Sequence, residues 1–241
     1  MSADVTRDIA PGGTLRIAIN YGNPVLAQKD PVSGEPRGVS ADIARELACR
    51  LAVPHAFVTF DAAGKVFEAL SRDAWDVAFM AIDPKRAAEI DFTPPYVVIE
   101  GSYMVPADSP LRVIDDVDRP GVRIAVGEGS AYDLYLTRTI RNARIVRAPT
   151  GSEAIAMFER EELEAAAGVK SPLLRYAQTR GGLRVMDGRF MAIEQAMGVP
   201  KGRTNAQAWL KGFIEEMKAG GFITEALQRH NIEGAAVAPR A

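Results

Sequence analysis

The chain alternates short apolar runs with stretches of helical periodicity, and it repeats this alternation in its second half. In the first half the apolar runs are 15–20, 56–60 and 75–81, and the periodic stretches between them are 39–52 and 64–72. Within 39–52, apolar residues recur every four positions at Ile43, Leu47 and Leu51. Strands that alternate with helices predict parallel pairing, so the sequence predicts an α/β sheet.

The second half repeats the pattern after an interruption near 104–112, where prolines break the periodicity. Strands are expected at 122–126, 143–148 and 163–169, the last as a strand or a buried segment, and helices at 130–142, 151–162 and 171–178. Residues 204–230 predict two helices separated at Gly220–Gly221, and the final nine residues predict a frayed tail. We therefore expect two similar α/β halves and a helical C-terminus.

Composition narrows the classes of function. The 241 residues carry a formal net charge of −2 with the charges interspersed, so nothing indicates nucleic acid or an anionic membrane as a partner. Cys49 is the single cysteine, which excludes an intrachain disulfide, and two histidines are too few for a His-rich metal site. No apolar run reaches the roughly 18 residues of a membrane span. The first residues are polar and show no secretory signal, so we expect either an intracellular protein or a form that begins after a signal.

A cation stands at an unexpected place in "AIDPKRAAEIDFTPPY", residues 81–96. Asp83 is a suitable N-cap and Pro84 suits the first helical position, which puts Arg86 in the first turn, where the helix dipole opposes it. A bound anion at this helix start would offset that cost. The alternative is a solvated Arg86 that pairs with Glu89, three residues on.

A second helix start follows the apolar run 122–126. In "GEGSAYD", Ser130 is a plausible N-cap and Asp133 sits at the reciprocal capping-box position. Gly127 and Gly129 would let the backbone approach a ligand closely, although an ordinary strand-to-helix turn has the same composition. Open α/β sheets bind ligands at the carboxyl ends of their strands, so a carboxylate could be held by Arg86 and the Ser130 turn together.

From about Gly13 to His230 the chain resembles the periplasmic solute-binding proteins of the polar amino acid ABC transporter type, family 3. The matching stretches, in order, are "GTLRIAIN", "GEPRGVSADIARELACRLAV", "WDVAFMAIDPKRAAEIDFTPPY", "GVRIAVGEGSAYD" and "MGVPKG". The resemblance implies a two-lobed type II periplasmic-binding fold, each lobe a mostly parallel sheet flanked by helices, with two hinge strands. The expected lobes are residues 1–105 with 198–241, and residues 106–197.

The resemblance also implies a ligand site. The arginine of the Pro-x-Arg helix grips the ligand α-carboxylate in this family, and here that residue is Arg86. The Gly-Ser/Thr turn of the second lobe assists, and here it comprises Gly129, Ser130 and Ala131. Two further positions are implied at the end of the first strand: a polar residue, Asn20, and an aromatic that stacks on the ligand, Tyr21, unless Tyr21 only packs on its own lobe.

The chain departs from this family at three of the implied positions. An acid that holds the ligand ammonium is expected before the Ser-Pro of "GVKSPLL", and Lys170 stands there instead. Ala81 replaces a threonine donor, and Phe79 replaces a small residue. A buried lysine disfavours an ammonium and favours a carboxylate, so we expect a pocket that is more apolar and more cationic than that of a typical amino-acid binder.

Three interpretations of Lys170 remain open at this stage. It contacts a second acidic group of the ligand, or it pairs with Glu194 of the "IEQAMGVPKG" strand, or the helix is shifted so that Lys170 faces solvent. Glu194 is also the remaining candidate to hold a ligand ammonium.

The resemblance predicts a non-catalytic, monomeric binding protein that captures a small carboxylate-bearing ligand by lobe closure and delivers it to an ABC permease. It implies a periplasmic location, and we expect no cofactor and no metal. One alternative is a cyclohexadienyl-dehydratase-like enzyme on the same fold, for which Glu194 or Glu100 would have to serve as the acid. Another is a ligand-sensing module that is not exported.

Overall fold

The computed structural model describes residues 3–241, and the chain divides into two compact units. Unit 1 comprises Met1–Val98 and Glu194–Ala241, and unit 2 comprises Ile99–Ile193. Both boundaries fall inside strands, β7 (Val97–Pro106) and β12 (Met191–Pro200), which carry the chain from one unit to the other and back. The boundaries therefore lie a few residues before the expected ones at 105 and 197.

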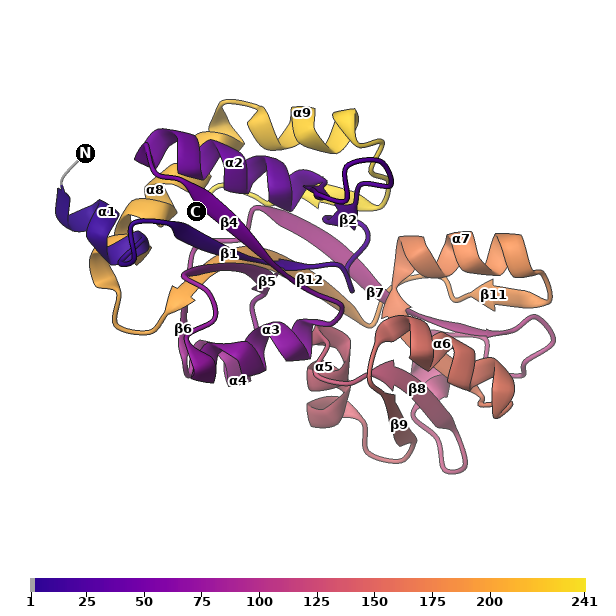
Figure 1. The fold of residues 1–241 in the computed structure, drawn as a ribbon. Coiled ribbons are helices and arrows are strands. Elements are labelled where there is room, and N and C mark those ends of the chain that lie inside the picture. The colour runs from indigo at the N-terminus through magenta and orange to yellow at the C-terminus, as the bar shows by residue number, and fades with distance from the viewer. Residues whose placement is uncertain (1–2) are drawn as a thin grey trace. The chain divides into compact units, whose positions relative to one another are not determined.

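Unit 1 is built on a parallel three-stranded core. Strand β1 (Leu15–Asn20) lies between β4 (His55–Phe60) and β5 (Val77–Ala81), parallel to both, and β12 pairs antiparallel with β5. The short strand β6 (Ile90–Phe92) adds to β12, and a small hairpin is formed by β2 (Gln28–Lys29) and β3 (Pro36–Arg37). Helices α2 (Val39–Leu51) and α3 (Ala63–Ala69), the latter extended by a 3-10 turn at Leu70–Arg72, lie on opposite sides of β1 (Figure 1).

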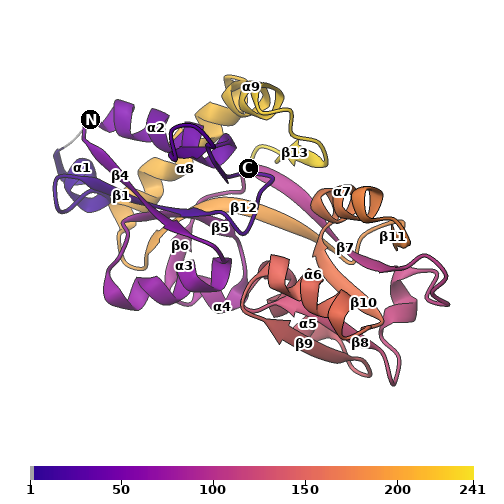
Figure 2. The same ribbon diagram turned by 45° about the vertical axis from the view of Figure 1, so that its right-hand side comes forward.

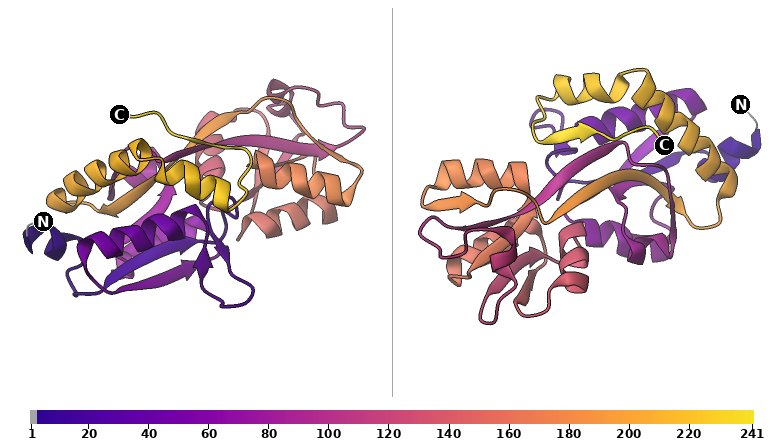
Figure 3. Two further views of the ribbon diagram at one scale, coloured as in Figure 1. Left: turned by 90° about the horizontal axis from the view of Figure 1, so that it is seen from above. Right: turned by 180° about the vertical axis from the view of Figure 1, so that it is seen from behind.

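The C-terminal segment closes unit 1. Helix α8 (Thr204–Ala219) packs on α1 (Ala3–Ile9), and α9 (Phe222–Arg229) packs on α2, as seen from above in Figure 3. The expected frayed tail is wrong in part, because Ala235–Val237 forms strand β13 on β7. The N–H of Ala238 donates to the carbonyl of Tyr96 at 3.0 Å. A three-residue strand is too short to show a periodicity, and it forms because the edge of β7 offers backbone partners.

Unit 2 repeats the plan of unit 1 (Figure 2). Strand β8 (Arg123–Gly127) lies between β9 (Arg144–Ala148) and β10 (Ala165–Val169), parallel to both, and β7 pairs antiparallel with β10. Strand β11 (Leu183–Val185) adds to β7. The helices are α5 (Ala131–Thr139), α6 (Gly151–Arg160) and α7 (Lys170–Arg180), with a 3-10 turn at Ile114–Val117.

The core of unit 2 has two faces because side chains alternate along each strand. Ile124 and Val126 of β8 pack in one cluster with Leu136 of α5, whereas Ala125 packs in the other with residues of α6 and α7 such as Phe158. Burial on both sides explains why these strands read as continuous apolar runs rather than as alternating ones. No helix among residues 3–241 is both long and apolar enough to cross a lipid bilayer.

In each unit an arginine and a carboxylate form a two-pronged ion pair at the amino ends of two neighbouring parallel strands, which are β1 and β5 in unit 1 and β8 and β10 in unit 2. We call each of these ion pairs a fork. In unit 1 the backbone N–H and Nε of Arg16 both donate to Oδ2 of Asp76 at 3.0 Å, and Nη2 donates to Oδ1 at 2.8 Å. In unit 2 Arg123 makes the same three bonds to Glu164, at 2.7, 2.9 and 2.8 Å. The Asp76 side chain is 1% exposed and also accepts from Arg203, whereas that of Glu164 is 36% exposed. The two forks share a geometry and differ in burial, which makes them a matched pair.

We predict that Asp76→Asn destabilises unit 1 by about 2 to 4 kcal/mol, because it removes a buried carboxylate that accepts hydrogen bonds from two partly buried arginines, Arg16 and Arg203. Glu164→Gln, at the exposed fork, should cost about 1 kcal/mol. Urea unfolding measures both. Tryptophan fluorescence follows unit 1, which contains both tryptophans, Trp75 and Trp209, and circular dichroism follows the whole chain. Equal losses for the two variants would show that burial does not set the strength of the fork.

The buried fork of Asp76 also predicts that the stability of unit 1 depends on pH. Burial opposes ionisation of Asp76, but the hydrogen bonds from Arg16 and Arg203 outweigh it and hold the pKa of Asp76 below its usual value. The stability that this group contributes is therefore present above its unfolded pKa of about 4 and is lost as the pH falls below that value. The difference in unfolding midpoint between wild type and Asp76→Asn should narrow between pH 7 and pH 3. A constant difference would contradict the assignment.

Candidate functional site

The carboxyl ends of the central strands collect the candidate residues of each unit. In unit 1, β1 ends at Asn20 and its parallel neighbour β5 ends at Ala81. In unit 2, β8 ends at Gly127 and its parallel neighbour β10 ends at Val169. Parallel neighbours end at the same edge of a sheet, so each unit presents two loops side by side, the position at which open α/β sheets bind ligands.

Arg86 is a buried cation just beyond the end of β5. Helix α4 (Pro84–Ala87) is a single turn, and Oδ1 of Asp83 caps it by accepting the N–H of Lys85 at 2.8 Å, as predicted. The Arg86 side chain turns back toward the strand, where Nη1 donates to the carbonyl of Ala81 at 2.8 Å. Because Arg86 is only 1% exposed, the alternative of a solvated arginine on the helix surface is wrong.

Burial makes this guanidinium a poorly solvated charge. It lowers the pKa of Arg86 to about 10, and the negative charge of Asp83 offsets part of that shift. Since α4 has one turn, its dipole is weak, and loss of hydration rather than the dipole is the main electrostatic cost at Arg86. A carboxylate brought to such a guanidinium would regain that cost through charge-assisted hydrogen bonds.

Phe79 and Ala81 face the interior of unit 1. Phe79 is 3% exposed and meets the ring of Tyr96 edge-on, with centroids 5.9 Å apart. Ala81 is also buried, and its carbonyl holds Arg86. The hydroxyls of Tyr96 and Ser40 are hydrogen-bonded at 3.0 Å. Phe79 and Ala81 are therefore both buried residues of β5, and of the two it is Ala81 whose carbonyl contacts Arg86.

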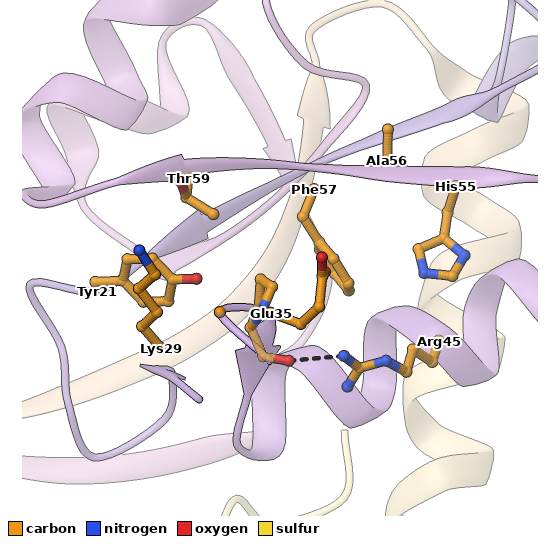
Figure 4. A pocket seen from close by; sticks show the side chains of 10 residues that line it. Tyr21, Lys29, Glu35, Arg45, His55, Ala56, Phe57 and Thr59 are labelled. Carbon is orange, nitrogen blue, oxygen red and sulfur yellow. Dashed lines mark hydrogen bonds between the residues drawn. The ribbon is translucent and has the colours of Figure 1, made fainter. Parts of the chain in front are cut away.

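Asn20 and Tyr21, at the end of β1, face different surroundings. Oδ1 of Asn20 accepts the N–H of Gly22 at 2.9 Å and shapes the loop. Tyr21 lines a cavity of ≈ 580 Å³ that also includes β4 residues. Figure 4 shows Tyr21 and Lys29 at one end of this cavity and His55 toward the other. Of the residues predicted to bind the ligand, Tyr21 is the one that lines this cavity among the described residues. Arg86 does not line it.

In unit 2 the Ser130 turn is a tight, internally bonded structure. Ser130 caps α5, since its Oγ accepts the N–H of Asp133 at 3.1 Å. The other half of the predicted capping box is wrong: Oδ2 of Asp133 accepts from the N–H of Gly129 at 2.9 Å, one residue before the cap. Gly129 adopts φ +67, and a Cβ at Gly127 would come within 2.7 Å of the Gly151 nitrogen, so both positions favour glycine.

Asp133 gives the turn its own counter-charge. Its buried carboxylate also receives Nε of Arg147 at 3.0 Å. The N–H of Gly129 is thus engaged within the turn. The N–H of Ala131, at the start of α5, has no acceptor within the helix, whereas the Ser130 hydroxyl also hydrogen-bonds the side chain of Tyr132.

Lys170 begins α7 and has a carboxylate partner that the sequence interpretations did not name. Nζ of Lys170 lies 3.3 Å from Oε2 of Glu100, and Nη1 of Arg189 lies 3.2 Å from Oε1 of the same residue. The Lys170 side chain is 28% exposed, so it does not extend freely into solvent. Glu100 comes from β7, and the three side chains form one cluster within unit 2 with two positive charges and one negative.

Glu194 lies in β12, where its carbonyl accepts the N–H of Ile82 at 2.9 Å and its side chain is exposed. Sequence reasoning missed the roles of Arg189 and of Asp133 as a partner of Gly129. Both depend on contacts between segments or on turn geometry, for which the sequence carries no periodic signal. Among residues 3–241, no group of His, Cys, Asp and Glu side chains is arranged to hold a metal ion.

Solved structures with the same fold include three amino-acid-binding proteins. A mutant arginine-binding protein from T. maritima is 20% identical, covers 95% of this chain and 100% of its own, and has a TM-score of 0.80. A solute receptor for L-cysteine of Neisseria gonorrhoeae is 22% identical, with coverages of 93% and 92% and a TM-score of 0.80. An ancestral amino-acid-binding protein, described as a precursor of cyclohexadienyl dehydratase, is 23% identical, with coverages of 93% and 98% and a TM-score of 0.77.

At these identities the likeness shows the fold, which is the two-lobed type II periplasmic-binding fold expected from the sequence. No match was found among curated protein sequences. The family of bacterial extracellular solute-binding proteins, family 3, matches over residues 15–232. The chain therefore belongs to the bacterial extracellular solute-binding proteins of family 3.

Proposed function

We propose that this protein binds a small carboxylate-bearing solute, an amino acid or an organic acid, and delivers it to an ABC permease. The observation that carries the proposal is the buried guanidinium of Arg86 at the carboxyl end of β5. Membership of the solute-binding family supports the transport role, and it favours a periplasmic location. We further propose that the protein acts as a monomer.

The energetics of Arg86 favour an anionic ligand. Removing a guanidinium from water costs several kcal/mol, and protein contacts repay this only with good geometry. A carboxylate accepts two parallel N–H bonds from the guanidinium fork, and each charge-assisted bond contributes about 1.5 to 3 kcal/mol. The burial of Arg86 strengthens those bonds because a buried site has a lower local dielectric than water.

Donors from unit 2 complete the proposed site. The Ser130 hydroxyl and the N–H of Ala131 would meet the same carboxylate, and Asn20, Tyr21 and Glu194 remain proposed contacts for the rest of the ligand. We propose that the ligand stabilises a closed form, with β7 and β12 as the hinge segments. The observed affinity would then be reduced by the fraction of protein that is open without ligand.

The ligands of the structural neighbours are consistent with this class. Two of them are an arginine-binding protein and a solute receptor for L-cysteine, and both of these amino acids carry an α-carboxylate. A dehydratase-like enzyme receives less support. Of its two candidate acids, Glu194 is exposed and Glu100 is engaged by Lys170 and Arg189. A sensing role differs from transport only in the partner.

We predict that Arg86→Met weakens ligand binding at least about a hundredfold, since the ligand carboxylate would lose its buried counter-charge. Isothermal titration with the tightest binder from a panel of proteinogenic L-amino acids and short dicarboxylates measures this. Lys85→Met is the matched control, because Lys85 is the neighbouring cation in the same turn and is exposed.

Arg86→Lys, which keeps the charge and loses the fork, should give an intermediate affinity. Circular dichroism verifies that each variant is folded. Wild-type affinity in a folded Arg86→Met protein would show that Arg86 does not bind the ligand. Equal losses of affinity in the Arg86→Met and Lys85→Met variants would show that Arg86 acts only through its positive charge.

Closure gives a separate prediction. Saturating ligand should lower the radius of gyration of wild type in small-angle X-ray scattering, because the closed form is more compact. The Arg86→Met variant at the same ligand concentration should keep the unliganded value. An unchanged radius in ligand-saturated wild type would contradict the hinge model while leaving binding itself intact.

A further inference from the structure

Strand β4 forms the edge of the sheet in unit 1, and the strand at the corresponding place in unit 2 is β9. Among residues 3–241, β4 pairs with β1 alone and β9 pairs with β8 alone. Edge strands normally carry charged residues or prolines, because their unpaired backbone groups attract other strands. Strand β9 carries two exposed arginines, Arg144 and Arg147, whereas β4 ("HAFVTF") contains no Lys, Arg, Asp, Glu or Pro. The edge of β4 is therefore unprotected.

The backbone groups that β4 turns outward belong to alternate residues. The N–H of Tyr21 donates to the carbonyl of Phe60 at 2.8 Å, so the backbone of Phe60 faces β1. Since the backbone groups of a strand alternate in direction, those of His55, Phe57 and Thr59 point away from β1, where no strand of the described chain pairs with them. Strand β4 thus offers unpaired N–H and carbonyl groups to a partner.

The cavity of ≈ 580 Å³ lies along this edge. In Figure 4 the side chains of His55 and Phe57 extend from β4 into the cavity, whereas Ala56 points the other way. Because Ala56 lines the cavity although its side chain points away, the cavity reaches the backbone of the strand. From His55 to Thr59 the strand rises by four steps of about 3.3 Å, or about 13 Å, which matches a short extended peptide.

The opposite wall of the cavity is the β2–β3 hairpin, which is held in place by hydrogen bonds. Oδ1 of Asp30 accepts the N–H groups of Val32 and Ser33 at 3.0 and 2.9 Å and closes the turn. Nη2 of Arg45, from α2, donates to the carbonyl of Pro36 at 2.7 Å and fastens the hairpin to the helix (Figure 4). The groove between β4 and the hairpin is thus preformed, so a partner would not have to order it on binding.

This groove carries an excess of positive charge. Lys29 and Arg45 line it together with one acid, Glu35. Lys29 is exposed and makes no ion pair within residues 3–241, and Arg45 has only a long one, at 3.9 Å, to Asp42. The groove therefore favours a partner that carries carboxylates, and the partly buried ring of Phe57 favours an apolar side chain between them.

We propose that the groove between β4 and the β2–β3 hairpin is a docking site for an extended acidic peptide of a partner protein, which adds to the sheet as a strand beside β4. Main-chain hydrogen bonds to the outward groups of β4 supply the affinity, and alternate side chains of the peptide supply the specificity. A carboxylate meets Lys29, and an apolar side chain packs on Phe57. The groove lies wholly in unit 1 and Arg86 does not line it, so peptide docking does not require the proposed carboxylate anchor.

A capped pentapeptide serves as the probe. It carries glutamate, valine and glutamate at every second position with threonine between them, so that the carboxylates and the valine share one face. In a titration of the full chain followed by amide NMR, the probe should shift the outward amides of His55, Phe57 and Thr59 saturably. The amides of Ala56 and Val58, which face β1, serve as the internal control and should shift less. Equal shifts at outward and inward amides, or none, would overturn the proposal.

Two analogues of the probe separate the kinds of contact. With lysine in place of glutamate the peptide should bind about fivefold more weakly, because the groove is positively charged. A peptide that is N-methylated throughout cannot donate hydrogen bonds to β4 and should not bind. Equal binding of the lysine analogue would contradict the acidic class, and binding of the N-methylated analogue would contradict strand addition.

Variants of the protein test the same two contacts. Lys29→Glu should weaken binding of the acidic probe about fivefold and strengthen binding of the lysine analogue. Lys211→Glu is the matched control, since Lys211 is an exposed cation of α8 that does not line the groove, and it should change neither. Thr59→Pro removes an outward N–H at an edge position that tolerates proline, and it should abolish binding while circular dichroism shows a folded chain. Equal effects of the two lysine variants, or full binding by Thr59→Pro, would overturn the proposal.

Two other occupants of the groove give different results. Sedimentation of the protein alone tests for pairing of β4 with a second copy of the chain. A dimer that the probe dissociates would show that the groove takes that second copy, and it would overturn the peptide assignment. Free L-glutamate that shifts the same outward amides with the affinity of the probe would show a pocket for a small solute, and it would overturn the assignment as well.

Discussion

The parallel pairing of two central strands in each unit is the constraint on which the rest depends. Parallel neighbours require a helical crossover, and they bring their carboxyl ends to one edge and their amino ends to the other. Arg86 follows the carboxyl end of β5, the Ser130 turn follows that of β8, and Lys170 follows that of β10. At the amino ends stand the two arginine–carboxylate forks. The ion pairs and the residues proposed to bind the ligand therefore lie at opposite ends of the same strands, and a change at one end need not disturb the other.

The two units carry positive charge at their carboxyl edges in different ways. In unit 1 the guanidinium of Arg86 is almost fully buried, where a charge-assisted hydrogen bond is stronger than at the surface because the local dielectric is lower. In unit 2 the charges of Lys170, Arg189 and Glu100 are partly exposed, so each pair contributes little to stability by itself. The first arrangement is the one on which the proposed carboxylate anchor rests.

The regular elements were predictable because their side chains repeat at the period of the structure. The runs 15–20 and 75–81 became β1 and β5, and Asp83 with Pro84 starts α4 as the sequence indicated. The errors arose where a partner distant in sequence, or a turn geometry, decides. Strand β13 forms because β7 offers it an edge, and Asp133 bonds Gly129 rather than Ser130 because the αL conformation of Gly129 brings that N–H to it.

By itself the sequence determined the order of the parallel strands and of the helices between them, the doubled α/β plan and the presence of Arg86 near a strand end, because periodicity, capping and spacing are local properties. It also showed that Lys170 replaces an expected acid. Only the tertiary structure decided that Arg86 is buried, that Glu100 and Arg189 flank Lys170, and that β4 lies at the edge of the sheet. Burial and pairing depend on segments that are distant in the sequence and meet only in the folded chain, so no local pattern encodes them.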